Sequence, residues 1–110
     1  MKGANLGEFE ELVLLTVAGL MQEAYSVWVC DELLNHTGCR VKLGVVHAVL
    51  NLLEETGLVK SQLGEATKSH GGKRKMILSA HYPGKEALVR AKSMRDQLWD
   101  SITSLVWRKV

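Results

Sequence analysis

The fold is decided by residues 58–79, where Leu58-Val59-Lys60-Ser61-Gln62-Leu63 is followed, after a polar loop, by Lys75-Met76-Ile77-Leu78-Ser79. Both segments have the length and the aliphatic content of short strands, and the loop between them contains the glycines that turns favour. The sequence therefore predicts a β-hairpin over these residues.

Three helical patterns precede the hairpin, and the first spans about residues 8–21. It begins after Gly7, a small residue suited to a helix cap, and its first turn carries carboxylates that complement the positive end of the helix dipole. The residues expected on its inner face recur at i, i+3 and i+4 spacing and are Phe9, Leu12, Val13, Thr16 and Leu20.

The next two helical patterns are separated by a short connector. The second covers about residues 25–36 and ends at Gly38, and the third covers about 43–56 and ends at Gly57. Their expected inner faces consist of Val29, Leu33 and Leu34 in the second helix and of Val46, Val49, Leu50 and Leu53 in the third. Three such helices followed by a hairpin predict a winged helix-turn-helix, a mainly α fold with a small β-hairpin.

A fourth helical pattern begins at Pro83 and is the longest, about 25 residues at a rise of about 1.5 Å each. It extends beyond a three-helix core, so its apolar stripe needs a partner, and a second copy of the chain in a two-fold dimer is the simplest one. The alternative is that the helix folds back on its own core. The residues expected at the dimer contact are Leu88, Ala91, Leu98, Trp99, Ile102 and Leu105. We therefore divide the chain into a winged helix-turn-helix domain, residues 1–82, and a dimerisation helix, residues 83–110.

The composition fits a single folded domain. The chain has 110 residues, of which 46% are apolar and 24% charged, enough for one core and far from the balance of a disordered chain. No secretion signal is recognisable, and no apolar run approaches the roughly 20 residues that span a bilayer, so we expect a cytoplasmic protein without membrane association. The two cysteines, Cys30 and Cys39, are expected to be free thiols.

The net charge is only +2, but the charges are unevenly placed. Residues 1–38 carry one lysine against six carboxylates, whereas residues 39–75 carry seven lysines and arginines against three glutamates. A basic stretch confined to one part of a domain is what a phosphate-facing surface requires. The alternative is a merely solvated surface.

The candidate contacts to double-stranded DNA lie in the third helix, in the connector before it and in the basic wing, about residues 64–75 between the strands of the hairpin. The third helix leaves Gly44, His47 and Asn51 on its outer side, where Asn51 can pair with adenine and His47 with a purine N7 or a phosphate. The candidates for phosphate contact are Arg40, Lys42, Lys73, Arg74 and Lys75. For His47 the alternative is a surface histidine that makes no contact.

No other chemistry is indicated by the sequence. The spacings Cys-x-x-Cys and His-x-x-x-His are absent, so no metal or other cofactor is expected, and Cys30 is expected to be a buried apolar residue. Because no nucleophile motif, phosphate-binding glycine loop or catalytic pair of carboxylates is recognisable, we do not expect an enzyme.

Five stretches, in this order, resemble the PadR-like family of winged helix-turn-helix transcriptional regulators. They are LGEFEELVLL (6–15), AYSV (24–27), LEETGLV (53–59), GGKRK (71–75) and GKEAL (84–88), and the likeness extends over nearly the whole chain. The single helix after the wing is similar to the smaller type of the family. The resemblance implies a repressor that binds an operator as a homodimer, with the third helix in the major groove and the fourth helix pairing the subunits.

The chain departs from the family pattern at several positions. The family usually has a small hydroxyl residue near position 42, a tyrosine at 47, aromatic residues around 77–78 and a threonine before the fourth helix. This chain has Lys42, His47, Ile77, Leu78 and His81 there. These departures concern the operator contact and leave the expected fold unchanged.

Two further expectations concern Trp99 and the third helix. The resemblance implies that Trp99 lines a pocket between the subunits that accepts a planar, apolar small-molecule effector. The alternative for Trp99 is an aromatic anchor packed in the dimer contact. The unusually apolar third helix also keeps a second function open, that of a winged-helix protein-interaction module that has lost DNA binding.

Overall fold

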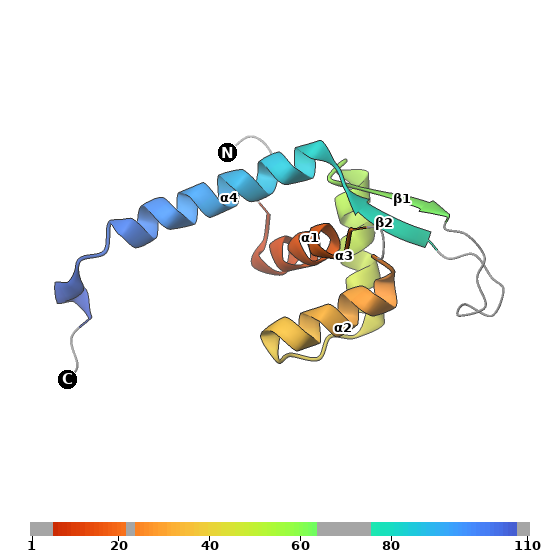
Figure 1. Ribbon diagram of the computed structural model, residues 1–110, viewed down its shortest axis with the longest axis horizontal. Helices are drawn as coiled ribbons and strands as arrows, with labels where there is room; N and C mark the ends of the chain where they lie inside the picture. Colours follow the sequence, from red (N-terminus) through yellow and green to blue (C-terminus); the bar gives the residue numbers. More distant parts are fainter. Residues whose placement is uncertain (1–5, 22–23, 64–75, 108–110) are drawn as a thin grey trace.

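The computed structural model describes residues 6–21, 24–63 and 76–107. The elements along the chain are α1 (Glu8–Leu20), α2 (Ser26–Thr37), α3 (Leu43–Glu55), β1 (Val59–Leu63), β2 (Met76–Ala80), α4 (Tyr82–Asp100) and the 3₁₀ helix η3 (Ser104–Val106). The first three helices and the hairpin form one body, and α4 extends from it past α1 (Figure 1). The molecule therefore measures 59 × 33 × 20 Å. The order of α1 to α4 and of the two strands is the one predicted, whereas η3 replaces the predicted end of the fourth helix.

One core lies between the three helices and the root of the hairpin. Its buried aliphatic side chains include Val13, Leu14 and Val17 of α1, Val29 and Leu33 of α2, Val46, Leu50 and Leu53 of α3, and Leu58, Val59 and Leu78. Removing this apolar surface from water is the main contribution to folding. The predicted inner faces of α2 and α3 are confirmed, with Leu34 and Val49 half-buried at their edges.

The predicted inner face of α1 is wrong in part. Leu14 and Val17 are fully buried, whereas Thr16 is only half-buried. The hydroxyl of Thr16 donates to the carbonyl of Leu12 at 2.7 Å within the helix itself. Because residues 12–15 are all apolar, their periodicity is compatible with more than one inner face.

Glycines end α2 and α3, as predicted. Gly38 has φ 73° and donates its amide to the carbonyl of Leu34 at 2.8 Å. Gly57 has φ 80°, and the next amide, that of Leu58, donates to the carbonyl of Leu53 at 2.9 Å. Side chains disfavour a positive φ, which is why glycine stands at both helix ends. The turn at Gly57 leads the chain directly into β1.

The hairpin is antiparallel, with Val59 opposite Ala80, Ser61 opposite Leu78 and Leu63 opposite Met76. The first strand begins one residue later than predicted and the second ends one residue later, while Lys75, the predicted start of the second, lies outside the described residues. On the outer edge of β2, the amide of Leu78 donates to the carbonyl of Ala24 at 3.0 Å. The root of the hairpin is therefore attached to the segment between α1 and α2.

α4 contacts the body at its first turn and again at Arg95, in its second half. The amide of His81 donates to the carbonyl of Leu58 at 2.9 Å, and a Cβ on Gly84 would lie 2.5 Å from that same oxygen. Farther along, Arg95 Nη1 lies 2.8 Å from Oε2 of Glu11 in α1. Within α4, all of which is described, the buried residues are Gly84 and Ala87.

The predicted length of the fourth helix is wrong. α4 has 19 residues and ends at Asp100, so Ile102, Leu105 and Trp107 lie beyond it instead of along its face. Asp100 is unfavourable at the negative end of the helix dipole. The hydroxyl of Ser101 donates to the carbonyl of Leu98 at 2.7 Å, and β-branched residues follow, so continuing the helix is disfavoured. None of the described helices is both long and apolar enough to cross a membrane.

Candidate nucleic-acid interface

α3 has one face in the core and the other in solvent. His47 and Asn51 are exposed one helical turn apart, and Gly44 precedes them on the exposed side, as predicted. The exposed residues of α3 also include the aliphatic Leu43, Val45 and Leu52, whose exposed fractions are 41–47%. The solvent face of α3 therefore offers His47 and Asn51 as candidates to hydrogen-bond to bases, together with aliphatic side chains and, in the last turn, two exposed glutamates.

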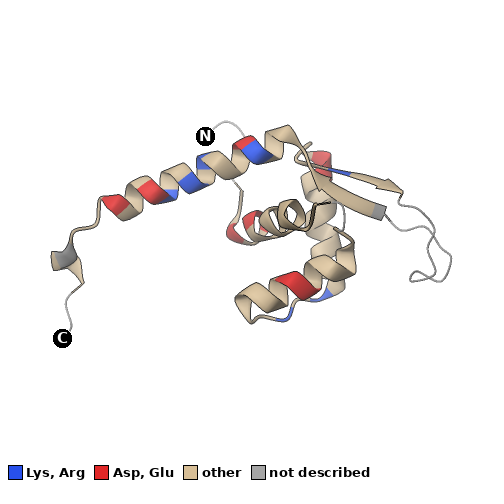
Figure 2. Ribbon diagram, viewed as in Figure 1, with Lys and Arg blue, Asp and Glu red and all other residues tan. Residues whose placement is uncertain are grey.

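Cationic side chains lie at both ends of α3. Arg40 and Lys42 are exposed in the connector, and the carbonyl of Lys42 accepts the amide of Val46 at 3.2 Å as α3 begins. At the other end, Lys60 is exposed on β1. Figure 2 shows cations on the connector and on β1, whereas α1 and α2 carry acidic residues. The sequence reasoning did not single out Lys60, because the hydrophobic pattern of β1 does not alternate and so does not identify its solvent side.

The wing cations Lys73, Arg74 and Lys75 lie outside the described residues. The described part of the wing is its root, where β1 is joined to α3 by two hydrogen bonds. Glu54 Oε2 accepts the hydroxyl of Ser61 at 2.6 Å and the backbone amide of Ser61 at 3.3 Å. No sequence motif pointed to this contact, which depends on how the turn at Gly57 brings β1 back beside α3.

The six residues predicted at a dimer contact lie in three environments. Leu88 and Ala91 are half-buried on the first part of α4, whereas Leu98 and Trp99 near its end are 65% and 68% exposed. Ile102 and Leu105 are exposed beyond the helix. We use the name C-terminal apolar cluster for Leu98, Trp99, Ile102, Leu105 and Trp107. The rings of Trp99 and Trp107 have centroids 6.1 Å apart and an interplanar angle of 37°.

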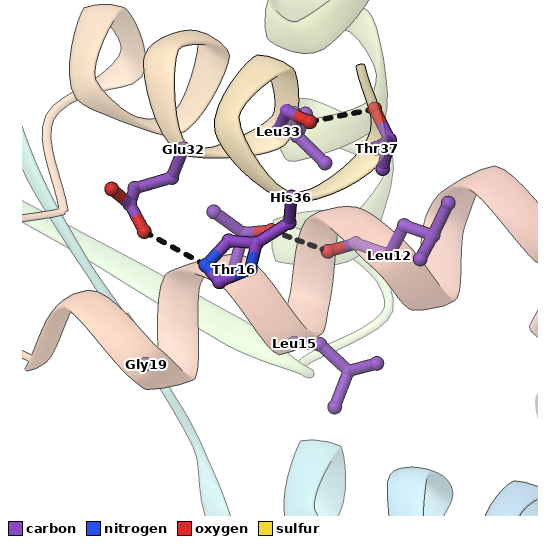
Figure 3. Close-up of a pocket in the computed structure, with 8 residues that line it drawn as sticks. All are labelled: Leu12, Leu15, Thr16, Gly19, Glu32, Leu33, His36 and Thr37. Atoms are coloured by element: carbon purple, nitrogen blue, oxygen red, sulfur yellow. Dashed lines mark hydrogen bonds and ion pairs between the residues drawn. The ribbon is translucent and has the colours of Figure 1, made fainter. Parts of the chain in front are cut away.

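A groove of about 350 Å³ lies between α1 and α2. Figure 3 shows Glu32 and His36 together at this groove, with Oε2 and Nε2 3.2 Å apart. The hydroxyls of Thr16 and Thr37 donate to carbonyl groups of their own helices, so much of the remaining lining is aliphatic. Neither Trp99 nor any predicted DNA-contact residue lines this groove.

The cysteines differ in their surroundings. Both are free thiols, Cys39 exposed and Cys30 half-buried, so the predicted burial of Cys30 is only partial. Burial, together with the nearby carboxylate of Asp31, raises the pKa of the Cys30 thiol. Among residues 6–21, 24–63 and 76–107, no three His, Cys, Asp or Glu side chains are grouped so that they could hold a metal ion.

The fold is similar to that of several solved regulators. A PadR-like transcriptional regulator from Bacillus cereus matches with a TM-score of 0.74 and 16% identity, over 92% of this chain and 93% of that one. PadR family regulators from Clostridium difficile and Eggerthella lenta match with TM-scores of 0.69 and 0.68 and with 20% and 22% identity. Those matches cover 86% and 93% of this chain and 93% and 88% of theirs.

No protein-family model matches the sequence, and no curated protein matches it. At these identities the structural likeness speaks for the fold. It confirms the predicted winged helix-turn-helix with a single long helix after the wing, and it confirms the resemblance to PadR-like structures.

Proposed function

We propose that this protein is a non-enzymatic transcriptional regulator that binds a double-stranded DNA operator through α3 and the wing. The proposal is carried by the solvent face of α3, where His47 and Asn51 stand between Arg40 and Lys42 at one end and Lys60 at the other. Side chains that read base edges, flanked by cations that bind phosphates, are the arrangement of major-groove recognition. Three bacterial proteins of the same fold are described as transcriptional regulators.

In this proposal, direct reading of bases is limited. Asn51 pairs with adenine, His47 meets a purine N7 or a phosphate, and Gly44 allows the backbone to approach the DNA. The aliphatic side chain of Val45 rests on a thymine methyl group. Affinity then depends chiefly on phosphate contacts by Arg40, Lys42, Lys73, Arg74 and Lys75, and DNA shape supplies part of the discrimination.

The same proposal includes a homodimer that acts as a cytoplasmic repressor. The C-terminal apolar cluster projects far from the core, and a second copy covers it and brings a second α3 to the operator. A planar, apolar effector inserted beside Trp99 would change how the two copies are held and thereby release the DNA. If no effector exists, Trp99 is an aromatic anchor of the dimer contact.

The test is a mobility-shift titration with the DNA upstream of the protein's own gene at several salt concentrations. We expect binding that weakens with salt, and we expect Lys73→Ala/Arg74→Ala/Lys75→Ala to flatten the slope of log affinity against log salt by about one unit per lost phosphate contact. The matched control is Lys85→Ala/Arg90→Ala/Lys92→Ala, which removes the same charge from α4 and should leave the slope nearly unchanged. Equal slopes in both triple variants would contradict the role of the wing.

A second candidate function is favoured by the aliphatic residues exposed on α3. Val45 and Leu52 lie together on one flank of the exposed face, with Leu43 exposed on the other flank, and exposed aliphatic side chains of this kind can bind another protein without DNA. The same titration separates the two functions, because this candidate predicts no DNA binding even at low salt.

A further inference from the structure

At the root of the wing, both strands are hydrogen-bonded to neighbouring elements, and the two bonds start from residues that face each other in the hairpin. Ser61 of β1 stands opposite Leu78 of β2. The amide of Leu78 donates outward to the carbonyl of Ala24 at 3.0 Å, and the amide of Ser61 donates outward to Glu54 Oε2 at 3.3 Å. In an antiparallel ladder the facing pairs that exchange no hydrogen bonds have both amides turned away from the hairpin. Ser61 and Leu78 form such a pair, and the outward amide of each donates to an acceptor outside the hairpin.

The two attachments differ in kind. The bond from Leu78 joins two backbone groups, so it forms whatever the side chains are. The bond from Ser61 depends on one carboxylate, which also accepts the hydroxyl of Ser61 at 2.6 Å. A hydroxyl bonded to a carboxylate at this length is a charge-assisted hydrogen bond, stronger than a neutral one. The side-chain attachment of β1 to α3 at Ser61 therefore depends on the identity of residue 54, whereas the start of β1 is also held by the bond from Leu58 to Leu53 and by the burial of Val59.

The position of Glu54 on α3 places it beside the proposed base-reading residues. It follows His47 and Asn51 at i+7 and i+3, so the three residues lie along one stripe of the helix. A carboxylate beside the proposed base-reading residues would repel phosphates if it faced the DNA. It is turned to β1 instead. The side chain of Glu55, the next residue, is exposed and makes no hydrogen bond or ion pair with the side chains or backbone of the described residues.

We propose that Glu54 is a positioning residue that sets the direction of the wing relative to α3, so that both engage the operator together. The inference deepens the proposed function and rests on it. Glu54 need not touch DNA for this role. It holds the first wing strand beside the end of the helix that reads the bases, and the connection passes through the hydroxyl and the amide of Ser61 alone.

The test compares Glu54→Ala with Glu55→Ala in the full chain. Both variants remove one negative charge from the same end of α3, so electrostatics alone should raise DNA affinity equally. We expect Glu54→Ala to bind the operator about tenfold more weakly than Glu55→Ala, because it loses both hydrogen bonds that the Glu54 carboxylate accepts from Ser61. Glu54→Gln, which keeps an oxygen acceptor, should recover most of the difference, and adding Ser61→Ala to Glu54→Ala should cause no further loss.

Two readouts separate positioning from general destabilisation. Hydroxyl-radical footprinting should show that Glu54→Ala loses backbone protection at the edge of each half-site and keeps protection at the α3 contact, whereas uniform weakening would overturn the proposal. Amide exchange of residues 59–63 in the free protein should be faster in Glu54→Ala than in Glu55→Ala, and equal exchange would also overturn it. If the unaltered protein binds no DNA, the proposed function fails as well. If it binds and the two variants bind equally, only the role of Glu54 fails.

Discussion

At the scale of single residues, Gly84 decides where α4 can lie. A Cβ at this position would be 2.5 Å from the carbonyl oxygen of Leu58 and 3.4 Å from Cδ1 of Leu14. The same carbonyl accepts the amide of His81, so the backbone of Leu58 contacts the start of α4 at both His81 and Gly84. The φ of Gly84 is not in the positive range, so its backbone conformation does not require glycine. The close approach of the two backbones does.

Gly84→Ala should therefore lower the free energy of unfolding by about 1–3 kcal/mol, because the added methyl group meets backbone that cannot move aside. Urea denaturation measures this change. The control is Gly19→Ala in α1, where no atom lies within 4 Å of the new Cβ and removing a helical glycine should stabilise by about 0.5–1 kcal/mol. Changes of the same sign in the two variants would contradict this explanation.

The two thiols give a second prediction at this scale. The raised pKa of Cys30 leaves less thiolate at neutral pH, and the thiolate is the form that reacts. We expect iodoacetamide to label the exposed Cys39 first and to label Cys30 increasingly as the pH rises toward its raised pKa. Mass spectrometry of the folded protein measures both rates, with Cys39→Ser as the control that isolates Cys30. Preferential labelling of Cys30 at pH 7 would contradict the prediction that Cys30 is the less reactive thiol.

At the scale of elements, α4 is tied to α1 by one ion pair between residues far apart in the chain. The side chain of Glu11 is only 9% exposed, and its Oε2 lies 2.8 Å from Arg95 Nη1, whose side chain is 56% exposed. Within α4, only Gly84 and Ala87 are buried. The pair therefore holds the second half of α4 along the body.

Arg95→Ala should destabilise the protein by about 1–3 kcal/mol, because the buried carboxylate of Glu11 loses its charged partner. Lys92→Ala is the matched control, since it removes the same charge from the same helix and breaks only an exposed pair with Asp96. Its effect should be much smaller. Chemical denaturation measures the free energy of unfolding of both variants. Similar decreases in the two would show that the contact to Glu11 contributes little.

At the scale of the whole molecule, the long axis is set by α4, which extends past α1 and leaves the C-terminal apolar cluster away from the core (Figure 1). Exposed apolar side chains gathered near one end of a helix are typical of a surface that binds another chain. The division into a domain of residues 1–82 and a dimerisation helix of residues 83–110 stays a prediction, and so does the homodimer.

Leu98→Glu should convert a dimer into a monomer, because it places a charge inside the proposed contact. Val89→Glu is the matched control, since Val89 is also exposed on α4 but lies outside the predicted contact. Sedimentation equilibrium measures the change. Operator affinity of Leu98→Glu should fall about 100-fold or more as the two half-sites are no longer bound together. A monomeric unaltered protein, or a dimeric Leu98→Glu, would contradict the dimer.

Much of the fold could be predicted from the sequence because its signals are local. The apolar positions of α3 recur with the helical period, and Gly38 and Gly57 end α2 and α3 at positions where only a positive φ continues the chain. His47 and Asn51 were assigned to the solvent face of α3 by the same periodicity. The contacts of these residues with DNA remain a proposal.

The inner face of α1 and the contacts that join the wing and α4 to the rest of the fold were decided by tertiary structure. The run of apolar residues 12–15 satisfies more than one helical face, and packing against the other elements of the core selects Leu14 and Val17. Glu54 meets Ser61 because the chain turns at Gly57, and Glu11 meets Arg95 because α4 returns along α1. The sequence by itself determined where helices and strands form, since hydrophobic period and glycine act within a few residues. Which side chains meet across elements depends on the packed arrangement of all of them, and that arrangement exists only in the folded chain.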